Sequence, residues 1–212
     1  MVKALKKIVP CERIEIKTNP GENSNKFKSM VIKFESVSNK FLPADYITMQ
    51  YTNPLVDLKA LRNSGTFTIN SYSDFKIGVL VSDHALKNEF DKRVKGLNLH
   101  YNKFLIKFSP PYIELEFDIP ASGISPKDRK LVEKFIKNNK FEGYAALRLE
   151  VHDNKIFASP IKVILNHFLL PMTVINELTK RINPLYHIPR IQPFNYSLEK
   201  VGIQKKYILF SN

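Results

Sequence analysis

The stretch Asn53–Asn70, NPLVDLKALRNSGTFTIN, combines the signals of a short helix with those of a strand that follows it. Asn53 suits a helix cap and Pro54 suits the first helical position. Leu55, Leu58 and Leu61 then recur at every third residue. Gly65 is suited to end the helix, after which Thr66–Asn70 alternates with a period of two. The stretch therefore predicts a helix over residues 54–63 and a strand over residues 66–70. The start of the helix suits an anion site, and a plain cap explains it equally well.

Alternation of apolar and polar residues predicts strands on both sides of this stretch. Asp153 and Asn154 separate two such runs and indicate a hairpin turn. The strands expected from the pattern are Glu12–Lys17, Phe27–Phe34, Tyr46–Tyr51, Phe75–Val81, Phe141–Val151, Lys155–Leu165, Ser197–Val201 and Lys206–Phe210, with two or three more in Leu97–Phe117.

Helical spacing appears in three further segments: from the cap Ser82 to Gly96, in the charged segment Pro126–Asn138, and in Pro171–Ile182. Many strands with few helices between them favour an antiparallel barrel or sandwich over a parallel sheet. No linker or change in composition marks a boundary, so we expect one domain over residues 1–212.

The chain carries a formal net charge of +13, which attracts nucleic acid, an acidic surface or a phosphorylated small molecule. Its 26 lysines and 7 arginines are spread along the chain. Arginine is the better fork for phosphates and bases, so a lysine-rich proteome explains the charge equally well. The charge alone leaves the class of partner open.

Several classes of protein are disfavoured by what the sequence lacks. No apolar run approaches the roughly 20 residues of a membrane span, and Met1–Pro10 has no apolar stretch suited to a signal peptide, so we expect a cytoplasmic protein. Cys11 is the only cysteine, and no two histidines stand at metal-ligand spacing. No glycine-rich phosphate loop or serine elbow is present. If the protein is an enzyme, we expect a bound cofactor to carry the reaction.

Four stretches, in this order, resemble the flavin reductase-like family of FMN-binding split barrels. They are Ser24–Ser29 (SNKFKS), Tyr46–Tyr51, Leu58–Asn70 (LKALRNSGTFTIN) and Val79–Phe90 (VLVSDHALKNEF), and Ser109–Phe117 is a weaker fifth match. The match covers roughly the first half of the chain. The residues Ser71–Ile77, the segment Pro126–Asn138 and the part after Pro171 look like additions, and the family's Gly-Asp-His segment has only Val151-His152-Asp153 as a counterpart.

The resemblance implies a mainly β fold, an antiparallel Greek-key split barrel of six strands with added helices, assembled as a homodimer. It also implies FMN near the dimer interface and hydride transfer to or from the flavin, as in an oxidoreductase. Alternatively, the chain resembles the uncharacterised archaeal relatives of that family. Carried over by position, the residues that hold the flavin phosphate are Ser24, Asn25, Lys26, Thr52 and Asn53.

Two other functions stay open at this point. A nucleic-acid-binding module would gather lysines on one face beside exposed tyrosine or phenylalanine. A non-catalytic interaction protein on the same barrel would instead show an apolar partner surface.

Overall fold

The computed structural model describes residues 1–23, 25–37, 44–96, 101–123, 139–188, 194 and 196–212. Strands dominate it, and all pairs of neighbouring strands are antiparallel. In chain order the elements are α1 (Val2–Ile8), β1 (Cys11–Pro20), β2 (Phe27–Val37), β3 (Ala44–Thr52), β4 (Leu55–Val56), α2 (Leu58–Asn63), β5 (Ile69–Ser71), β6 (Asp74–Ser82), α3 (Asp83–Gly96), β7 (Lys103–Ser109), β8 (Tyr112–Pro120), the 3-10 turn η1 (Ala121–Gly123), β9 (Lys140–His152), β10 (Lys155–Leu165), β11 (Phe168–Leu169), α5 (Met172–Ile182), β12 (Tyr186–His187), β13 (Lys200–Ile203) and β14 (Tyr207–Ser211).

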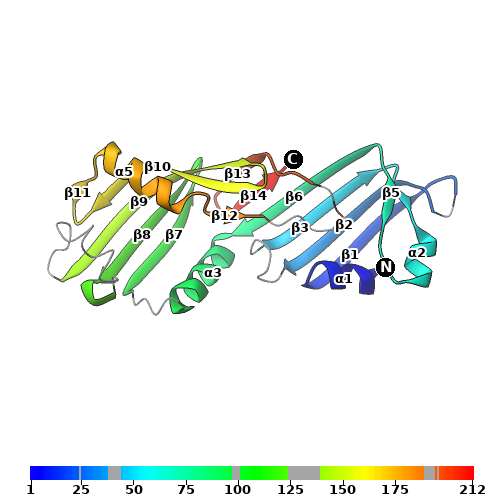
Figure 1. Cartoon of the computed structure of the whole chain (residues 1–212), viewed down its shortest axis with the longest axis horizontal. Helices are drawn as coiled ribbons and strands as arrows, with labels where there is room; N and C mark the ends of the chain where they lie inside the picture. The colour runs from blue at the N-terminus through cyan, green and yellow to red at the C-terminus, as the bar shows by residue number, and fades with distance from the viewer. Residues whose placement is uncertain (24, 38–43, 97–100, 124–138, 189–193, 195) are drawn as a thin grey trace.

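The strands form two large sheets and a small one. Sheet A has six strands in the order β1-β2-β3-β6-β14-β13, and sheet C has five in the order β11-β10-β9-β8-β7, with β12 paired to β10. The small sheet B pairs β4 with β5. Figure 1 shows sheets A and C following one another along the long axis of the molecule, with β13 and β14 near its middle.

Each strand of sheet A turns its apolar residues toward one face, which we call the inner face. The opposite, outer face carries alternating charges, among them Arg13, Glu15 and Lys33. This alternation is the signal that predicts the strands from the sequence. The buried side chains of the inner face are Met30, Ile32, Phe34, Ile47, Met49, Tyr51, Ile77, Val79, Val81, Ile208 and Phe210.

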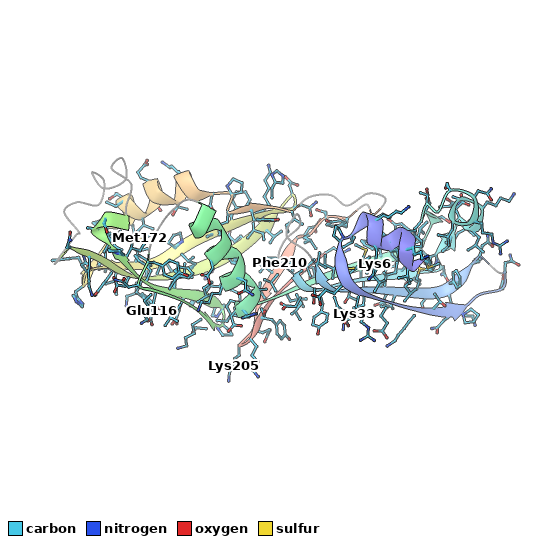
Figure 2. All side chains as sticks on the ribbon, turned by 90° about the horizontal axis from the view of Figure 1, so that it is seen from below. Lys6, Lys33, Glu116, Met172, Lys205 and Phe210 are labelled. Carbon is cyan, nitrogen blue, oxygen red and sulfur yellow. The ribbon has the colours of Figure 1, made fainter. Side chains whose placement is uncertain are left out.

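Helices cover the inner faces of both sheets. α1 buries Leu5 completely in the core of sheet A, and α5 packs Ile175 against Leu165 in a smaller core at the far end of sheet C. Figure 2 shows Lys6 and Met172, which belong to these two helices, on one side of the molecule. Lys33 and Glu116 lie on the opposite side, so the outer faces of the two sheets share one surface.

The two sheets share their main core, and the C-terminal segment closes it. The core includes Ile113, Leu149 and Ile156 of sheet C together with the inner face of sheet A. Asn154, at the tip of the β9–β10 hairpin, is buried: its Nδ2 donates to the carbonyl of Tyr196 (3.2 Å) and its Oδ1 accepts from the N–H of Leu198 (2.7 Å). The hairpin tip therefore fixes the segment that leads into β13.

Most of the predicted strands are confirmed, as is the mainly β, antiparallel fold. The hairpin at Asp153 and Asn154 is confirmed too, and both residues have the positive φ that a tight hairpin turn requires. The helices from Ser82 to Gly96 and over 171–182 are present as α3 and α5. The predicted helix Pro126–Asn138 lies outside the described residues, where 124–138 are omitted.

The helix predicted over residues 54–63 is wrong in its first half. Leu55 and Val56 form β4, and α2 begins only at Leu58, with Asp57 as its cap. The Asp57 side chain accepts a hydrogen bond from the N–H of Ala60 at 2.8 Å, so Asn53 caps nothing. The predicted strand over 66–70 is shorter and later than expected, since β5 covers Ile69–Ser71.

Two more differences concern the edges of the fold. α1 lies in the segment Met1–Pro10, for which the sequence pattern predicted no helix. Among the described residues, no pairing joins β1 to β13, the two edge strands of sheet A. No helix in the described part of the chain has both the length and the apolar character needed to cross a membrane.

Candidate functional site

Two connections meet at one corner of sheet A and bring four of the five sequence-predicted site residues together. The N–H of Val56 donates to the carbonyl of Asn25 (2.9 Å), and the N–H of Asn53 donates to the carbonyl of Lys28 (3.0 Å). Lys26 also forms a bridge with Leu55. The loop between β1 and β2 is therefore held against the turn between β3 and β4. Ser24 lies outside the described residues.

Asn53 takes a role other than helix capping. Its φ is +50°, a region in which asparagine is among the residues most often found, and its Nδ2 donates to Ser73 Oγ at 3.1 Å. Ser73 Oγ in turn donates to the carbonyl of Thr52 at 3.1 Å. This chain of bonds joins the end of β3 to the start of β6. The predicted anion site at a helix start on Asn53 is thus wrong, because α2 starts four residues after Pro54 and is only six residues long.

Thr52 lies on the outer face of sheet A, opposite to the inner-face side chain of Tyr51. Its register partners are Ser29 in β2 and Asp74 in β6. Successive side chains of a strand point to opposite faces. The Thr52 hydroxyl is therefore directed away from the aromatic group of the inner face. The Thr52 carbonyl is the atom that takes part in this corner, because it accepts the hydrogen bond from Ser73 Oγ.

Three aromatic rings form the apolar part of the corner. The ring centroids of Tyr51 and Phe75 are 4.7 Å apart, and Tyr72 lies 5.4 Å from Tyr51 and 5.9 Å from Phe75. Tyr51 is buried, whereas Tyr72 keeps 43% of its surface exposed. Burial raises the pKa of the Tyr51 hydroxyl well above its usual value, and the nearby Tyr72 adds to the rise. The exposed Tyr72 ring is therefore available to a ligand, and the buried Tyr51 ring packs against Tyr72.

Two lysines belong to the same corner. Lys26 and Lys28 are both exposed, and neither forms an ion pair with a carboxylate among the described residues. Lysine ammonium groups with the Asn53 amide are suitable donors for a phosphate. Sequence reasoning missed Tyr72 and Ser73, which it assigned only to a turn. Tyr72 stands three residues before Phe75 and is out of step with the two-residue period of β6, so no sequence pattern pointed to it.

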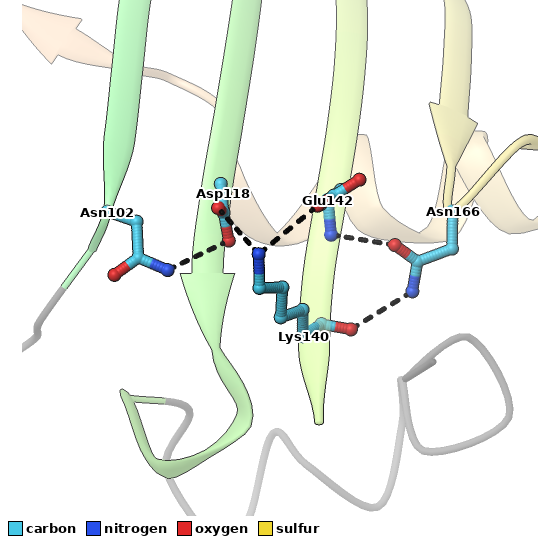
Figure 3. Close-up of polar contacts among 5 residues, drawn as sticks. All are labelled: Asn102, Asp118, Lys140, Glu142 and Asn166. Atoms are coloured by element: carbon cyan, nitrogen blue, oxygen red, sulfur yellow. Dashed lines mark hydrogen bonds and ion pairs between the residues drawn. The ribbon is translucent and has the colours of Figure 1, made fainter. Parts of the chain in front are cut away.

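A cleft of about 390 Å³ lies at the other end of the molecule, on the outer face of sheet C. Figure 3 shows its polar network: Lys140 Nζ lies 3.7 Å from Asp118 Oδ2 and 3.8 Å from Glu142 Oε1. Asn166 Oδ1 accepts from the N–H of Glu142 at 2.8 Å, and Asn102 Nδ2 donates to Asp118 at 3.2 Å. These groups satisfy one another, so the network fixes the strand ends of sheet C.

A second ion pair in this cleft neutralises another of its carboxylates. Lys103 Nζ donates to Glu116 Oε2 at 2.7 Å, and this hydrogen bond, together with the charge of Lys103, lowers the pKa of Glu116. Within the described part of the chain no cluster of histidine, cysteine and carboxylate side chains could hold a metal ion. His152 lies beside Glu150 at 3.8 Å on an exposed strand end.

The two alternative functions require a basic face and an apolar surface, respectively. On the outer face of sheet A, cations alternate with anions: Lys17 lies 3.0 Å from Glu15, and Lys33 lies 3.2 Å from Glu35. A one-sided basic stripe for nucleic acid is absent from that described face. The most exposed large apolar side chains, Phe168, Leu169 and Met172, stand close together in sequence where β11 leads into α5, at the end of sheet C remote from sheet A.

In comparisons with known proteins, no family model matches the chain, and no curated protein or solved structure matches it either.

Proposed function

We propose that this protein binds a phosphorylated aromatic ligand at the corner formed by Asn25, Lys26, Asn53 and Tyr72, with FMN as the ligand. The observation that carries the proposal is the meeting of two loops separated in sequence, which brings cationic and amide donors to the corner where Ser73, next to the exposed Tyr72, is bonded. FMN carries both a phosphate and a planar ring, which a ribityl chain joins. The resemblance to FMN-binding split barrels points to Asn25, Lys26 and Asn53 independently of this geometry, whereas Tyr72 lies in a stretch that the resemblance does not cover.

The chemistry of the donors fits a phosphomonoester. Lys26 and Lys28 would neutralise its charge, and the amide of Asn53 would donate a directed hydrogen bond. A hydrogen bond to a charged group contributes about 1.5–3 kcal/mol. Tyr72 would stack on the flavin ring, since its contacts with Tyr51 and Phe75 hold the Tyr72 ring in place.

When bound, FMN supplies hydride transfer, and the class of reaction would be that of a flavin-dependent oxidoreductase. This chain's own part is to hold and orient the ligand, because no catalytic pair of side chains stands at the corner among the residues described. Under the same proposal β2, β3 and β6 of sheet A correspond to strands of the family's split barrel, and the protein acts as a homodimer.

Titration with FMN tests the proposal. We expect saturable quenching of flavin fluorescence by the native protein. Lys26→Glu combined with Lys28→Glu should raise the dissociation constant at least tenfold, since two attractive charges become repulsive. Tyr72→Ala should weaken binding and reduce the quenching at saturation.

Lys205→Glu is the matched control, because Lys205 is an exposed lysine in the turn between β13 and β14, away from the corner (Figure 2). It should bind FMN as the native protein does. Unchanged flavin fluorescence at every protein concentration would rule out FMN. If Lys205→Glu weakened FMN binding equally, the effect of the changes at Lys26 and Lys28 would be one of net charge and not of a binding site.

A further inference from the structure

β1 presents a free backbone edge, and the direction of its hydrogen bonds can be worked out. The N–H of Asn53 donates to the carbonyl of Lys28, so the even-numbered residues of β2 bond toward β3. Backbone groups alternate in direction along a strand, so the odd-numbered residues of β2 bond toward β1. Glu15 lies opposite Lys33 in this register, and the odd-numbered residues of β1 are therefore the ones bonded to β2.

The even-numbered residues Ile14, Ile16 and Thr18 consequently direct their N–H and C=O groups away from sheet A. The Lys6 side chain agrees with this assignment, because its Nζ reaches the outward carbonyl of Glu12 at 2.8 Å. No other described strand pairs with β1 on this side. An edge of this length is a template for a further strand.

The side chains beside the free edge carry alternating charges. Arg13, Glu15 and Lys17 follow one another on the outer face of β1, and Lys17 Nζ lies 3.0 Å from Glu15 Oε1. On the neighbouring strand β2, Lys33 is the register partner of Glu15. A further strand pairs favourably with β1 only if each of its charged side chains lies opposite a side chain of the opposite sign. Like charges directly opposite each other destabilise a sheet.

We propose that the β1 edge pairs antiparallel with β1 of a second copy of this chain, about a twofold axis at Ile16. Ile16 then lies opposite its own copy, and Ile14 lies opposite Thr18. Glu15 faces Lys17 of the second copy, twice by symmetry. The outer face gains a continuous row of alternating charge from that Lys17 through Glu15 to Lys33.

The ends of the strand fit this register. Glu12 falls opposite Pro20, which has no N–H to donate, and the Glu12 carbonyl is already occupied by Lys6. The paired ladder therefore ends without leaving an unsatisfied group on either strand. The inference rests on the β1 edge alone and does not depend on the flavin proposal.

Neighbouring registers fit less well. An axis at Glu15 sets Glu15 against itself and Arg13 against Lys17. An axis at Ile14 does place Arg13 opposite Glu15, but it sets Ile16 against Glu12, whose carbonyl Lys6 already holds. Charge and backbone together thus select the axis at Ile16.

Sedimentation velocity over a range of protein concentrations tests the interface. We expect a dimer for the native chain. Lys17→Glu should raise the dimer dissociation constant at least tenfold, because Glu15 then faces a glutamate. The double variant Glu15→Lys with Lys17→Glu restores the opposite charges and should restore the dimer.

Two further variants complete the test. Ile16→Pro should abolish the dimer, and it keeps the fold because the Ile16 N–H is not used within the chain. Lys205→Glu, remote from β1, should leave the dimer unchanged. A native chain that is monomeric at all concentrations would overturn the proposal, and so would a dimer that Lys17→Glu does not weaken.

Discussion

Gly143 is a residue whose lack of a side chain decides local packing. A Cβ at this position would overlap the Phe117 ring, whose centroid lies 5.7 Å from the centroid of the Phe141 ring. We expect Gly143→Ala to lower the free energy of unfolding by about 1–3 kcal/mol, because the ring must leave its place. Urea unfolding measures the loss.

Gly202→Ala is the control for this change, since a Cβ there meets no atom within 4 Å. It should leave the urea midpoint almost unchanged. If the loss at Gly143 comes from the clash, then combining Gly143→Ala with Phe117→Leu should cost less than the sum of the two single changes. If the costs of Gly143→Ala and Phe117→Leu were additive, the loss of stability at Gly143 would not come from a clash with the Phe117 ring.

Tyr51 links stability to alkaline pH. Burial raises the pKa of its hydroxyl in the folded state above the value of about 10 in the unfolded chain. The folded state therefore binds this proton more tightly, so the free energy of unfolding falls as the pH rises above about 10. Unfolding measured near pH 9 and near pH 11 should show this fall. It should be smaller in Tyr51→Phe, and an equal fall in both proteins would assign it to other groups.

At the scale of elements, periodicity predicted the long strands because one face of each strand is buried. The same argument failed for residues 54–63. Leu55, Leu58 and Leu61 have helical spacing, yet Leu55 belongs to β4, where pairing with β5 outweighs the local preference. α1 was missed although Leu5 and Val9 stand at the i and i+4 positions, since a single buried pair is a weak signal.

The candidate site was predictable only in part, and for a similar reason. The resemblance named Lys26 and Asn53, but no local pattern reveals that the two loops touch, because their contact depends on the register between β2 and β3. The contribution of Tyr72 depends on the pairing of β6 with β3. Contacts of this kind are set by the sheet as a whole.

The cap of α2 gives a direct test at this scale. Asp57→Ala should lower the free energy of unfolding by about 0.5–2 kcal/mol, because its side chain satisfies the N–H of Ala60. Asn53→Ala should affect only the exposed bond to Ser73 and the backbone at positive φ. Far-ultraviolet circular dichroism during thermal unfolding can compare the variants. A loss of helical signal in Asn53→Ala but not in Asp57→Ala would reverse the assignment.

At the scale of the whole molecule, the shared core predicts that sheets A and C unfold together. Phe210 of β14 is buried in the core that contains Ile113 and Leu149 of sheet C. Phe210→Ala should cost about 3–5 kcal/mol. Hydrogen exchange should then show the slowest amides of β3 and of β9 losing protection by the same factor.

The control is Leu209→Ala on the same strand, whose side chain is exposed on the outer face and should cost far less. Loss of protection confined to β3 and its neighbours would mean that the sheets are separate cooperative units.

The order of strands in sheet A has a consequence for how the protein is made. β6 is complete once Ser82 has been synthesised, but its partner β14 begins at Tyr207, and the side chain of Asn212 finishes the join by bonding to Ile77 and Phe75. A nascent chain must therefore carry an open, apolar β6 edge while more than a hundred further residues leave the ribosome. During that interval the edge is a target for chaperones, and for mispairing between chains on neighbouring ribosomes.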